Sequence, residues 1–259
     1  MKNLKLRKQL FALMLASSIG LSVTGCGEEL GSSNDSYDVL KTVNNESTDT
    51  VNNESTDNVL SGVTQLIEVP GEEFKLKVIY SSDEKEWRIT SDKTLNMEIY
   101  TEGLPTNKEV YIDNIHTDTS IVSTKAKIDG IKQDTMDDRI HNSLMYGFPI
   151  SDTNSYYGIN EIEGENKEFI DGYIWGYNSL NKGEISQQRL LESDFLGCGV
   201  WANKIDSVID LIIIDNNTNE MRTVSVPSIL LVEANNKIRM SDGTTYEYDR
   251  EGNSKVLTR

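Results

Sequence analysis

Apolar and polar residues alternate over long stretches from Phe74 onward, and this period of two constrains the fold more than any other feature of the chain. The first alternating apolar residues are Phe74, Leu76, Val78 and Tyr80. Successive side chains of a β-strand point to opposite faces, so this alternation predicts strands that bury one face. The same pattern predicts further strands at 95–99, 110–115 and 120–128.

A nearly continuous apolar run at 208–214 is typical of a central strand that is covered on both faces. The Asn- and Asp-rich residues 215–219 then predict a turn. A returning strand at 221–226 is expected to stop at Pro227, because proline has no N–H to donate to a sheet ladder.

Helical patterns are sparse: the stretch after Ser186, through Glu192, could form two or three turns, and residues 134–139 one turn. Many short strands separated by polar turns predict a mostly β protein built as a β-sandwich, here at 67–235. Further short strands at 236–259 predict a small C-terminal β-meander. Such a meander is too short to be stable alone, so it must pack on the sandwich.

The second half of the chain shows a recognisable order of segments. The Gly-rich approach Gly197-Cys198-Gly199-Val200-Trp201 leads into the apolar strand, the Asn/Asp turn and a last strand. This order, at 190–226, resembles the closing half of immunoglobulin-like domains carried by Gram-positive lipoproteins. The resemblance implies an immunoglobulin-like β-sandwich and no particular activity, because a fold alone does not specify a function.

The first 25 residues have the organisation of an export signal. The positive segment contains Lys2, Lys5, Arg7 and Lys8. The apolar stretch that follows, from Leu10 to Leu21, is shorter than the ~20 apolar residues of a membrane-spanning helix. Val23-Thr24-Gly25-Cys26 resembles the lipobox of bacterial lipoproteins, in which an aliphatic and two small residues precede a cysteine. The resemblance implies cleavage before Cys26 and a lipid on its thiol, which anchors the chain to the extracytoplasmic face of the cell membrane.

Residues 26–66 have a different composition, dominated by Ser, Asn, Asp, Glu and Thr. An octet at 43–50 is repeated almost unchanged at 51–58. Two copies are too few for a solenoid, and so polar a segment cannot offset its ordering entropy by burial. The sequence therefore predicts a disordered linker between the lipid and the folded domain.

The net charge of the chain limits the classes of partner that it can bind. Removing residues 1–25 takes away four positive charges and no negative ones, so the formal charge of −17 becomes −21 in the mature chain. Such an acidic surface disfavours nucleic acid and repels anionic lipids. With Cys26 lipidated, Cys198 has no intramolecular partner for a disulfide.

Candidate catalytic residues are scattered. The two histidines, His116 and His141, each lie near carboxylates in a His/Asp cluster, but no spacing matches a known metal site. Cys198 lies between two glycines and could act as a nucleophile, although no base can be assigned and free cysteine is more often buried. An extracytoplasmic hydrolase that uses the His/Asp cluster or Cys198 is the alternative function.

A calcium loop is also disfavoured. Asp215, Asn217 and Asn219 have the spacing of its first ligands, but Glu220 and Val226 stand where the loop requires Gly and Glu. A plain hairpin turn is expected there, and neither a metal nor a cofactor is expected in the chain.

An aromatic segment at 169–177 is the strongest candidate for binding. On an extended strand, one face would carry Phe169, Tyr173, Trp175 and Tyr177. Aromatic faces stack on sugar rings and anchor protein interfaces, although such a row can equally be core. We therefore predict a non-catalytic binding or structural module whose partner is an envelope protein or a cell-wall glycan.

Overall fold

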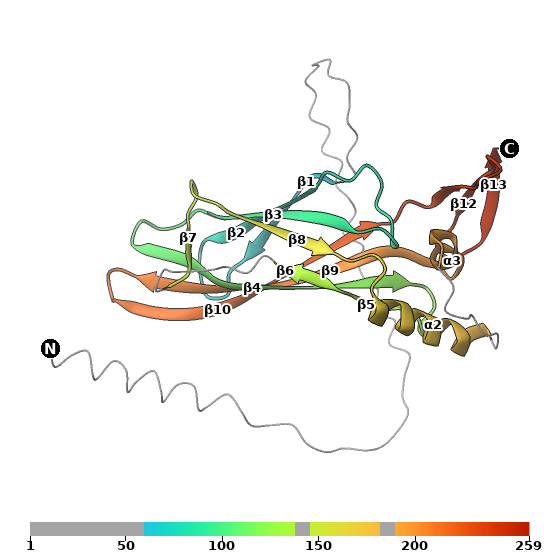
Figure 1. The fold of residues 1–259 in the computed structure, drawn as a ribbon. Helices are drawn as coiled ribbons and strands as arrows, with labels where there is room; N and C mark the ends of the chain where they lie inside the picture. The colour runs from blue at the N-terminus through green and yellow to red at the C-terminus, as the bar shows by residue number, and fades with distance from the viewer. Residues whose placement is uncertain (1–59, 138–145, 182–189, 259) are drawn as a thin grey trace, which may run out of the picture. The chain divides into compact units, whose positions relative to one another are not determined.

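The computed structural model describes residues 60–137, 146–181 and 190–258, all within one compact unit, Asn53–Arg259. Over these ranges the chain folds into two five-stranded antiparallel sheets, one three-stranded sheet and two helices (Figure 1). The prediction of a mostly β protein is confirmed. Residues 1–59 lie outside the described ranges, so the signal, Cys26 and most of the expected linker stay predictions.

The first sheet has the strand order β1-β2-β3-β8-β6. Its strands are β1 (Leu60–Glu68), β2 (Lys75–Ser82), β3 (Lys93–Glu102), β8 (Tyr156–Ile162) and β6 (Thr135–Asp137). In β2 the residues Leu76, Val78 and Tyr80 are buried and their neighbours are not, as the alternation predicts. β1 begins at Leu60, so the boundary predicted at residue 67 is wrong. The boundary was missed because β1 mixes polar and apolar residues, and its exposed residues resemble the linker in composition.

The second sheet has the order β10-β9-β4-β5, and β7 also pairs with β4. Its strands are β10 (Glu220–Glu233), β9 (Val200–Asp215), β4 (Lys108–Ser123), β5 (Lys132–Gln133) and β7 (Phe148–Ile150). β9 is central, as predicted, but it is not covered on both faces. Its outward residues are half-buried, and Val208 is 39% exposed.

Two features of this sheet differ from the sequence predictions. β4 is a single long strand where two were expected, because a bulge at Asp113 shifts its register without ending the pairing with β9. β10 continues through Pro227, which pairs with Val208. This is possible because β10 is an edge strand whose one neighbour in the sheet is β9, and an edge strand tolerates a residue without an N–H.

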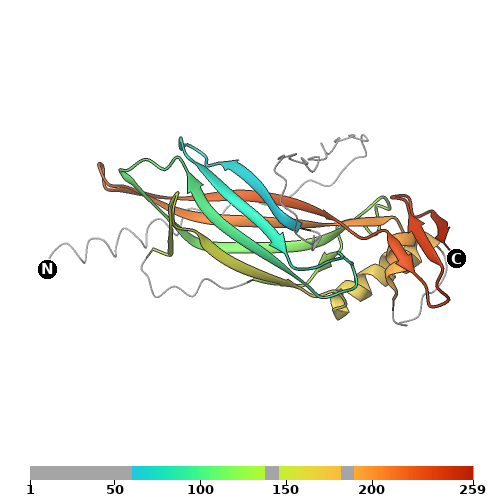
Figure 2. The same ribbon diagram turned by 90° about the horizontal axis from the view of Figure 1, so that it is seen from above.

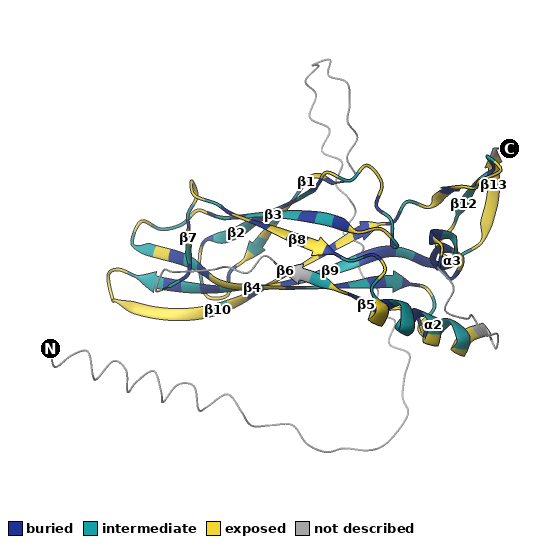
Figure 3. Ribbon diagram, viewed as in Figure 1, coloured by how far each residue is buried: buried dark blue, intermediate teal, exposed yellow. Residues whose placement is uncertain are grey.

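The two large sheets pack face to face and form a β-sandwich. One cluster of buried side chains takes members from both sheets, among them Leu76 and Ile99 of the first and Ile209, Leu211 and Val226 of the second. The outward side of β10 is exposed (Figure 3). The alternating pattern thus places one face of each sheet in a common core, which confirms the predicted sandwich.

The small sheet follows the order β11-β12-β13 (Lys237–Arg239, Thr245–Tyr248 and Ser254–Thr258). It lies where the meander was predicted. Ile238 and Tyr248 join a second core cluster together with side chains of both helices. The helices and the meander gather at one end of the sandwich (Figure 2).

Candidate functional site

The aromatic segment 169–177 lies within helix α2 (Lys167–Asn181), not on a strand. The helix starts after Asn166, whose Oδ1 accepts a hydrogen bond from the backbone N–H of Phe169 at 2.8 Å. A side-chain oxygen at this position satisfies one of the unpaired N–H groups of a first turn. The strand prediction is therefore wrong, and Asn166 followed by Glu168 was the sequence signal that could have corrected it.

The helix separates the four aromatic residues that were expected on one face. Phe169 and Tyr173 are spaced by one helical turn and are buried, and Tyr177, a turn further, is half-buried. Trp175 lies on the opposite side with Glu168 and is 65% exposed. The shared-face prediction fails because residues two apart point to different sides of a helix.

Helix α3 (Glu192–Gly197) packs against the buried side of α2. The ring of Phe195 lies 5.4 Å from that of Phe169 and 4.1 Å from that of Tyr173, measured between centroids. The hydroxyl of Tyr173 donates a hydrogen bond to the backbone oxygen of Asp194 at 2.7 Å. These contacts fix the two helices against each other.

The buried carboxylate of Glu192 attaches α3 to the sandwich. It accepts hydrogen bonds from the backbone N–H of Ile89 at 2.7 Å, the backbone N–H of Thr90 at 2.9 Å and the Thr90 hydroxyl at 2.8 Å. From the other side of this loop, Lys93 Nζ donates to the carbonyl oxygens of Arg88, Ile89 and Ser91. The loop between β2 and β3 is thus held between an anion and a cation, each with hydrogen-bonding partners.

The turn after β4 is joined to the end of α3. Ser123 Oγ donates to the Cys198 carbonyl at 3.1 Å, and Thr124 N–H donates to the Gly199 carbonyl at 3.1 Å. The same turn lies close to α2, because a Cβ at Gly176 would come within 2.5 Å of the Lys127 oxygen. Three separate segments are therefore fixed around Cys198.

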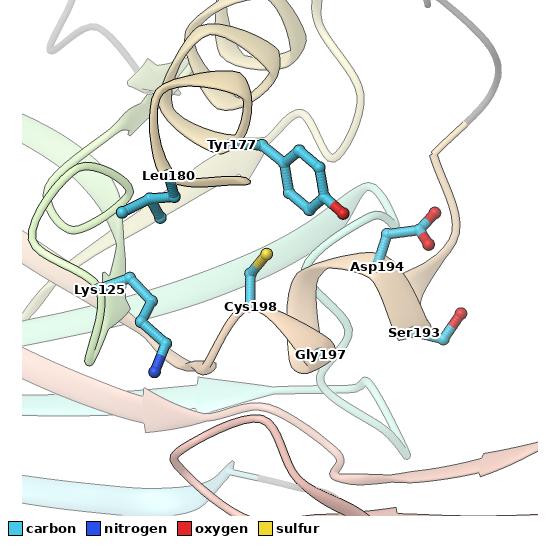
Figure 4. Close-up of a pocket in the computed structure, with 7 residues that line it drawn as sticks. All are labelled: Lys125, Tyr177, Leu180, Ser193, Asp194, Gly197 and Cys198. Atoms are coloured by element: carbon cyan, nitrogen blue, oxygen red, sulfur yellow. The ribbon is translucent and has the colours of Figure 1, made fainter. Parts of the chain in front are cut away.

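These segments border an open pocket of about 460 Å³, which we call the α2–α3 pocket (Figure 4). It is lined by Lys125, Tyr177, Leu180, Ser193, Asp194, Gly197 and Cys198. The volume lies within the ~300–1,000 Å³ range of small-ligand sites. The lining combines an aromatic ring, an aliphatic side chain, a cation, a carboxylate and a thiol.

Cys198 is 7% exposed, which confirms the expected buried cysteine. Burial raises its pKa, and this effect outweighs the neighbouring Tyr173 hydroxyl and the Lys125 charge, which both lower it; the Asp194 charge raises it further. A raised pKa keeps the thiol protonated at neutral pH. The attacking species in nucleophilic catalysis is the thiolate, so this environment disfavours Cys198 as a nucleophile.

The structure describes one of the two histidines of the His/Asp cluster. His116 is exposed on β4, with Nε2 at 3.7 Å from Asp118 Oδ2, and Lys132 Nζ lies 2.9 Å from the same oxygen. His141 lies outside the described residues. Across 60–137, 146–181 and 190–258, no group of three His, Cys, Asp or Glu side chains is arranged to hold a metal ion.

The predicted hairpin turn after β9 is confirmed. Asp215 Oδ1 accepts hydrogen bonds from the backbone N–H groups of Asn217 at 2.8 Å and Thr218 at 3.3 Å. Asn219 has a φ of 58°, a conformation that asparagine tolerates well. The carboxylate that could have begun a calcium loop is therefore used within the turn.

Comparison with known proteins returns no relative of this chain. No family model matches it, no curated protein matches it, and no solved structure matches its fold. The resemblance of residues 190–226 to immunoglobulin-like domains therefore stays a prediction. Neither of the two described helices is long and apolar enough to cross a bilayer.

Proposed function

We propose that this chain is a lipid-anchored, non-catalytic module on the extracytoplasmic face of the cell membrane, and that it binds an envelope protein or a cell-wall glycan. Trp175 carries the proposal. It is 65% exposed, more than any other large apolar side chain in the described part of the chain. It lies midway along α2, on the side turned away from the core.

The physical reason is that an exposed indole does not contribute the free energy that its burial would provide. Fully burying a large apolar side chain stabilises by about 1.5–3 kcal/mol, and α2 forgoes most of this at Trp175. Tryptophan is among the residues that most often dominate binding energy, because it combines a large apolar surface with one N–H donor. A partner that covers Trp175 recovers this energy, and a sugar ring or an apolar protein side chain can do so.

The chemistry expected of an enzyme has weaker support. Burial raises the pKa of the Cys198 thiol, which opposes nucleophilic use. His116 Nε2 lies 3.7 Å from Asp118 Oδ2 on an exposed strand face, a long surface contact. The hydrolase alternative is therefore the less favoured of the two functions.

Replacing Trp175 with Ala tests the binding proposal. We expect the free energy of unfolding to stay within about 0.5 kcal/mol of wild type, since the side chain is mostly in solvent. Retention of the protein on purified cell-wall glycan, or on immobilised envelope proteins, should fall sharply. Glu168→Gln, on the same side of α2, is the matched control and should retain binding.

A core substitution calibrates the measurement. Phe169→Ala empties a fully buried position and should cost ~3–5 kcal/mol. Two results would contradict the proposal: a loss of stability in Trp175→Ala close to that of Phe169→Ala, or binding by Trp175→Ala equal to wild type. Thermal unfolding and the retention assay together separate these outcomes.

A further inference from the structure

Two opposite charges flank the Cys198 thiol in the α2–α3 pocket. Figure 4 shows the Lys125 side chain on one side of Cys198 and Asp194 on the other. Both charges act on the thiol, since Lys125 lowers its pKa and Asp194 raises it. The pocket therefore has a positive end and a negative end within interaction range of the same sulfur atom.

Among the described residues, neither charge is neutralised by a strong ion pair. Lys125 Nζ lies 3.7 Å from Glu251 Oε2, and the Glu251 side chain is 65% exposed. Such a long, exposed pair contributes little. Asp194 uses Oδ2 to accept a hydrogen bond from Leu191 N–H at 2.7 Å. Its second carboxylate oxygen has no hydrogen-bond donor among the described residues.

The walls between the charges are apolar and aromatic. Tyr177 and Leu180 of α2 line the pocket above the thiol (Figure 4). Cys198 itself contributes a protonated, weakly polar surface. The pocket can therefore accept an apolar body as well as two charged groups, which is the common composition of a small-molecule site.

The backbone segments that carry both charges are held in place before any ligand arrives. The hydrogen bond from Tyr173 to the Asp194 carbonyl holds α3, and the Ser123 and Thr124 bonds hold the turn that carries Lys125. Lys125 is fixed further at its own backbone, since its carbonyl accepts from Ile128 and Asp129. A preorganised site loses less entropy on binding and gains affinity for that reason.

We propose that the α2–α3 pocket binds a small zwitterion of the amino-acid type, either a free amino acid or a short peptide with free termini. The ligand's carboxylate pairs with Lys125, its ammonium group pairs with Asp194, and its side chain packs on Tyr177 and Leu180. Charge-assisted hydrogen bonds of this kind are about twice as strong as neutral ones, and partial burial strengthens them. This site is distinct from the outward face of α2 that carries Trp175.

Calorimetric titration of the full chain with a matched probe set tests the inference. L-phenylalanine carries both charges, its amide lacks the carboxylate, and 3-phenylpropionate lacks the ammonium group. The dipeptide Gly-Phe separates the two ligand sources. We expect L-phenylalanine or Gly-Phe to bind about tenfold or more tightly than either singly charged probe, the typical effect of one lost charged hydrogen bond.

Two conservative substitutions then assign the charges. Lys125→Met should remove the preference for the zwitterion over the amide, and Asp194→Asn should remove the preference over 3-phenylpropionate. Asparagine can still accept the Leu191 hydrogen bond, so the start of α3 is kept. Lys132→Met and Asp171→Asn, which change charges outside the pocket, are the matched controls and should leave affinity unchanged.

A local readout confirms the position of the ligand. In the full chain with Cys26→Ala, Cys198 is the remaining thiol. A bound zwitterion should slow its alkylation by iodoacetamide, and 3-phenylpropionate at the same concentration should not. Equal binding of all probes, absence of saturable binding, or unchanged alkylation would overturn the inference. The probe comparison uses no pocket variant, so it holds even if Lys125→Met or Asp194→Asn fails to fold.

The two proposals fail separately. Loss of envelope binding in Trp175→Ala with unchanged zwitterion affinity supports both sites as independent. If the zwitterion binds but Trp175→Ala has no effect on envelope binding, the function proposed for α2 is contradicted and the proposal for the pocket is still supported.

Discussion

Glu72 shows how single residues hold the sandwich closed at the turn between β1 and β2. Its side chain is 3% exposed and accepts hydrogen bonds from Lys108 of β4 and Arg222 of β10. Burial alone would raise the pKa of Glu72, but the hydrogen bonds and charges of these two partners outweigh it and hold the pKa below its ordinary value. One carboxylate thus joins three segments that are far apart in sequence.

The lowered pKa gives this contact a defined pH dependence. A carboxyl group whose pKa is lower in the folded state stabilises the fold above its unfolded pKa, and this contribution is lost as pH falls through the folded pKa. We expect Glu72→Gln to lower the free energy of unfolding by about 1–3 kcal/mol at neutral pH, because both cations lose their anionic partner. The loss is not larger because Lys108 and Arg222 can still reach water. The difference from wild type should shrink as the pH falls below the ordinary pKa of a glutamate carboxyl group and through the lowered pKa of Glu72.

Urea unfolding at several pH values measures this effect. Glu68→Gln is the control, because Glu68 pairs with Lys75 on the surface with a side chain that is 73% exposed. It should change stability by less than about 0.5 kcal/mol. A difference between wild type and Glu72→Gln that stays constant from neutral to acidic pH would show that the carboxylate charge is not the cause.

At the scale of elements, α2 lies unusually close to its neighbours because two glycines face them. A Cβ at Gly172 would lie 3.2 Å from Ile131 Cγ2, and one at Gly176 would lie 2.5 Å from the Lys127 carbonyl oxygen. The first neighbour is the end of a side chain and the second is backbone. Gly176 is therefore required for the close approach that places Tyr177 over the pocket, whereas Gly172 has more room.

Gly176→Ala tests this packing. In a helix interior alanine is more favourable than glycine by up to ~1 kcal/mol, so this substitution would stabilise a helix that made no contacts. Here we expect a net loss of about 1–3 kcal/mol, because the methyl group must displace α2 or the turn. Ser179→Ala, on the exposed side of the same helix, should be neutral or slightly stabilising. A Gly176→Ala variant at least as stable as wild type in thermal unfolding would contradict the packing argument.

The proposed attachment of the whole molecule to the membrane depends on Cys26, the predicted site of the lipid. Replacing Cys26 with Ala should abolish incorporation of labelled palmitate and move the chain out of the membrane fraction, because no other segment is expected to hold it there. Cys198→Ala is the matched control and should keep the label, since Cys198 is buried in the folded domain. Continued labelling of the Cys26→Ala chain would show that the lipid is attached elsewhere.

The sequence determined the features that depend on local pattern. Alternation from Phe74 to Tyr80 defined β2 and its buried face, and the Asn/Asp turn after Asp215 defined the hairpin, because backbone geometry repeats within a few residues. The meander at the C-terminus followed from the same signals. These elements together predicted a β-sandwich.

Only the tertiary structure decided features that depend on distant neighbours. The apolar residues of the segment 169–177 fit the period of a strand as well as that of a helix. Packing of Phe169 and Tyr173 against Phe195 favours the helix and leaves Trp175 on its exposed side. Pro227 is tolerated because β10 became an edge, a property of strand order. The α2–α3 pocket joins Lys125, Tyr177 and Asp194 from three separate segments. No local sequence pattern predicts that these residues lie close together, because their proximity arises only when the chain folds back on itself.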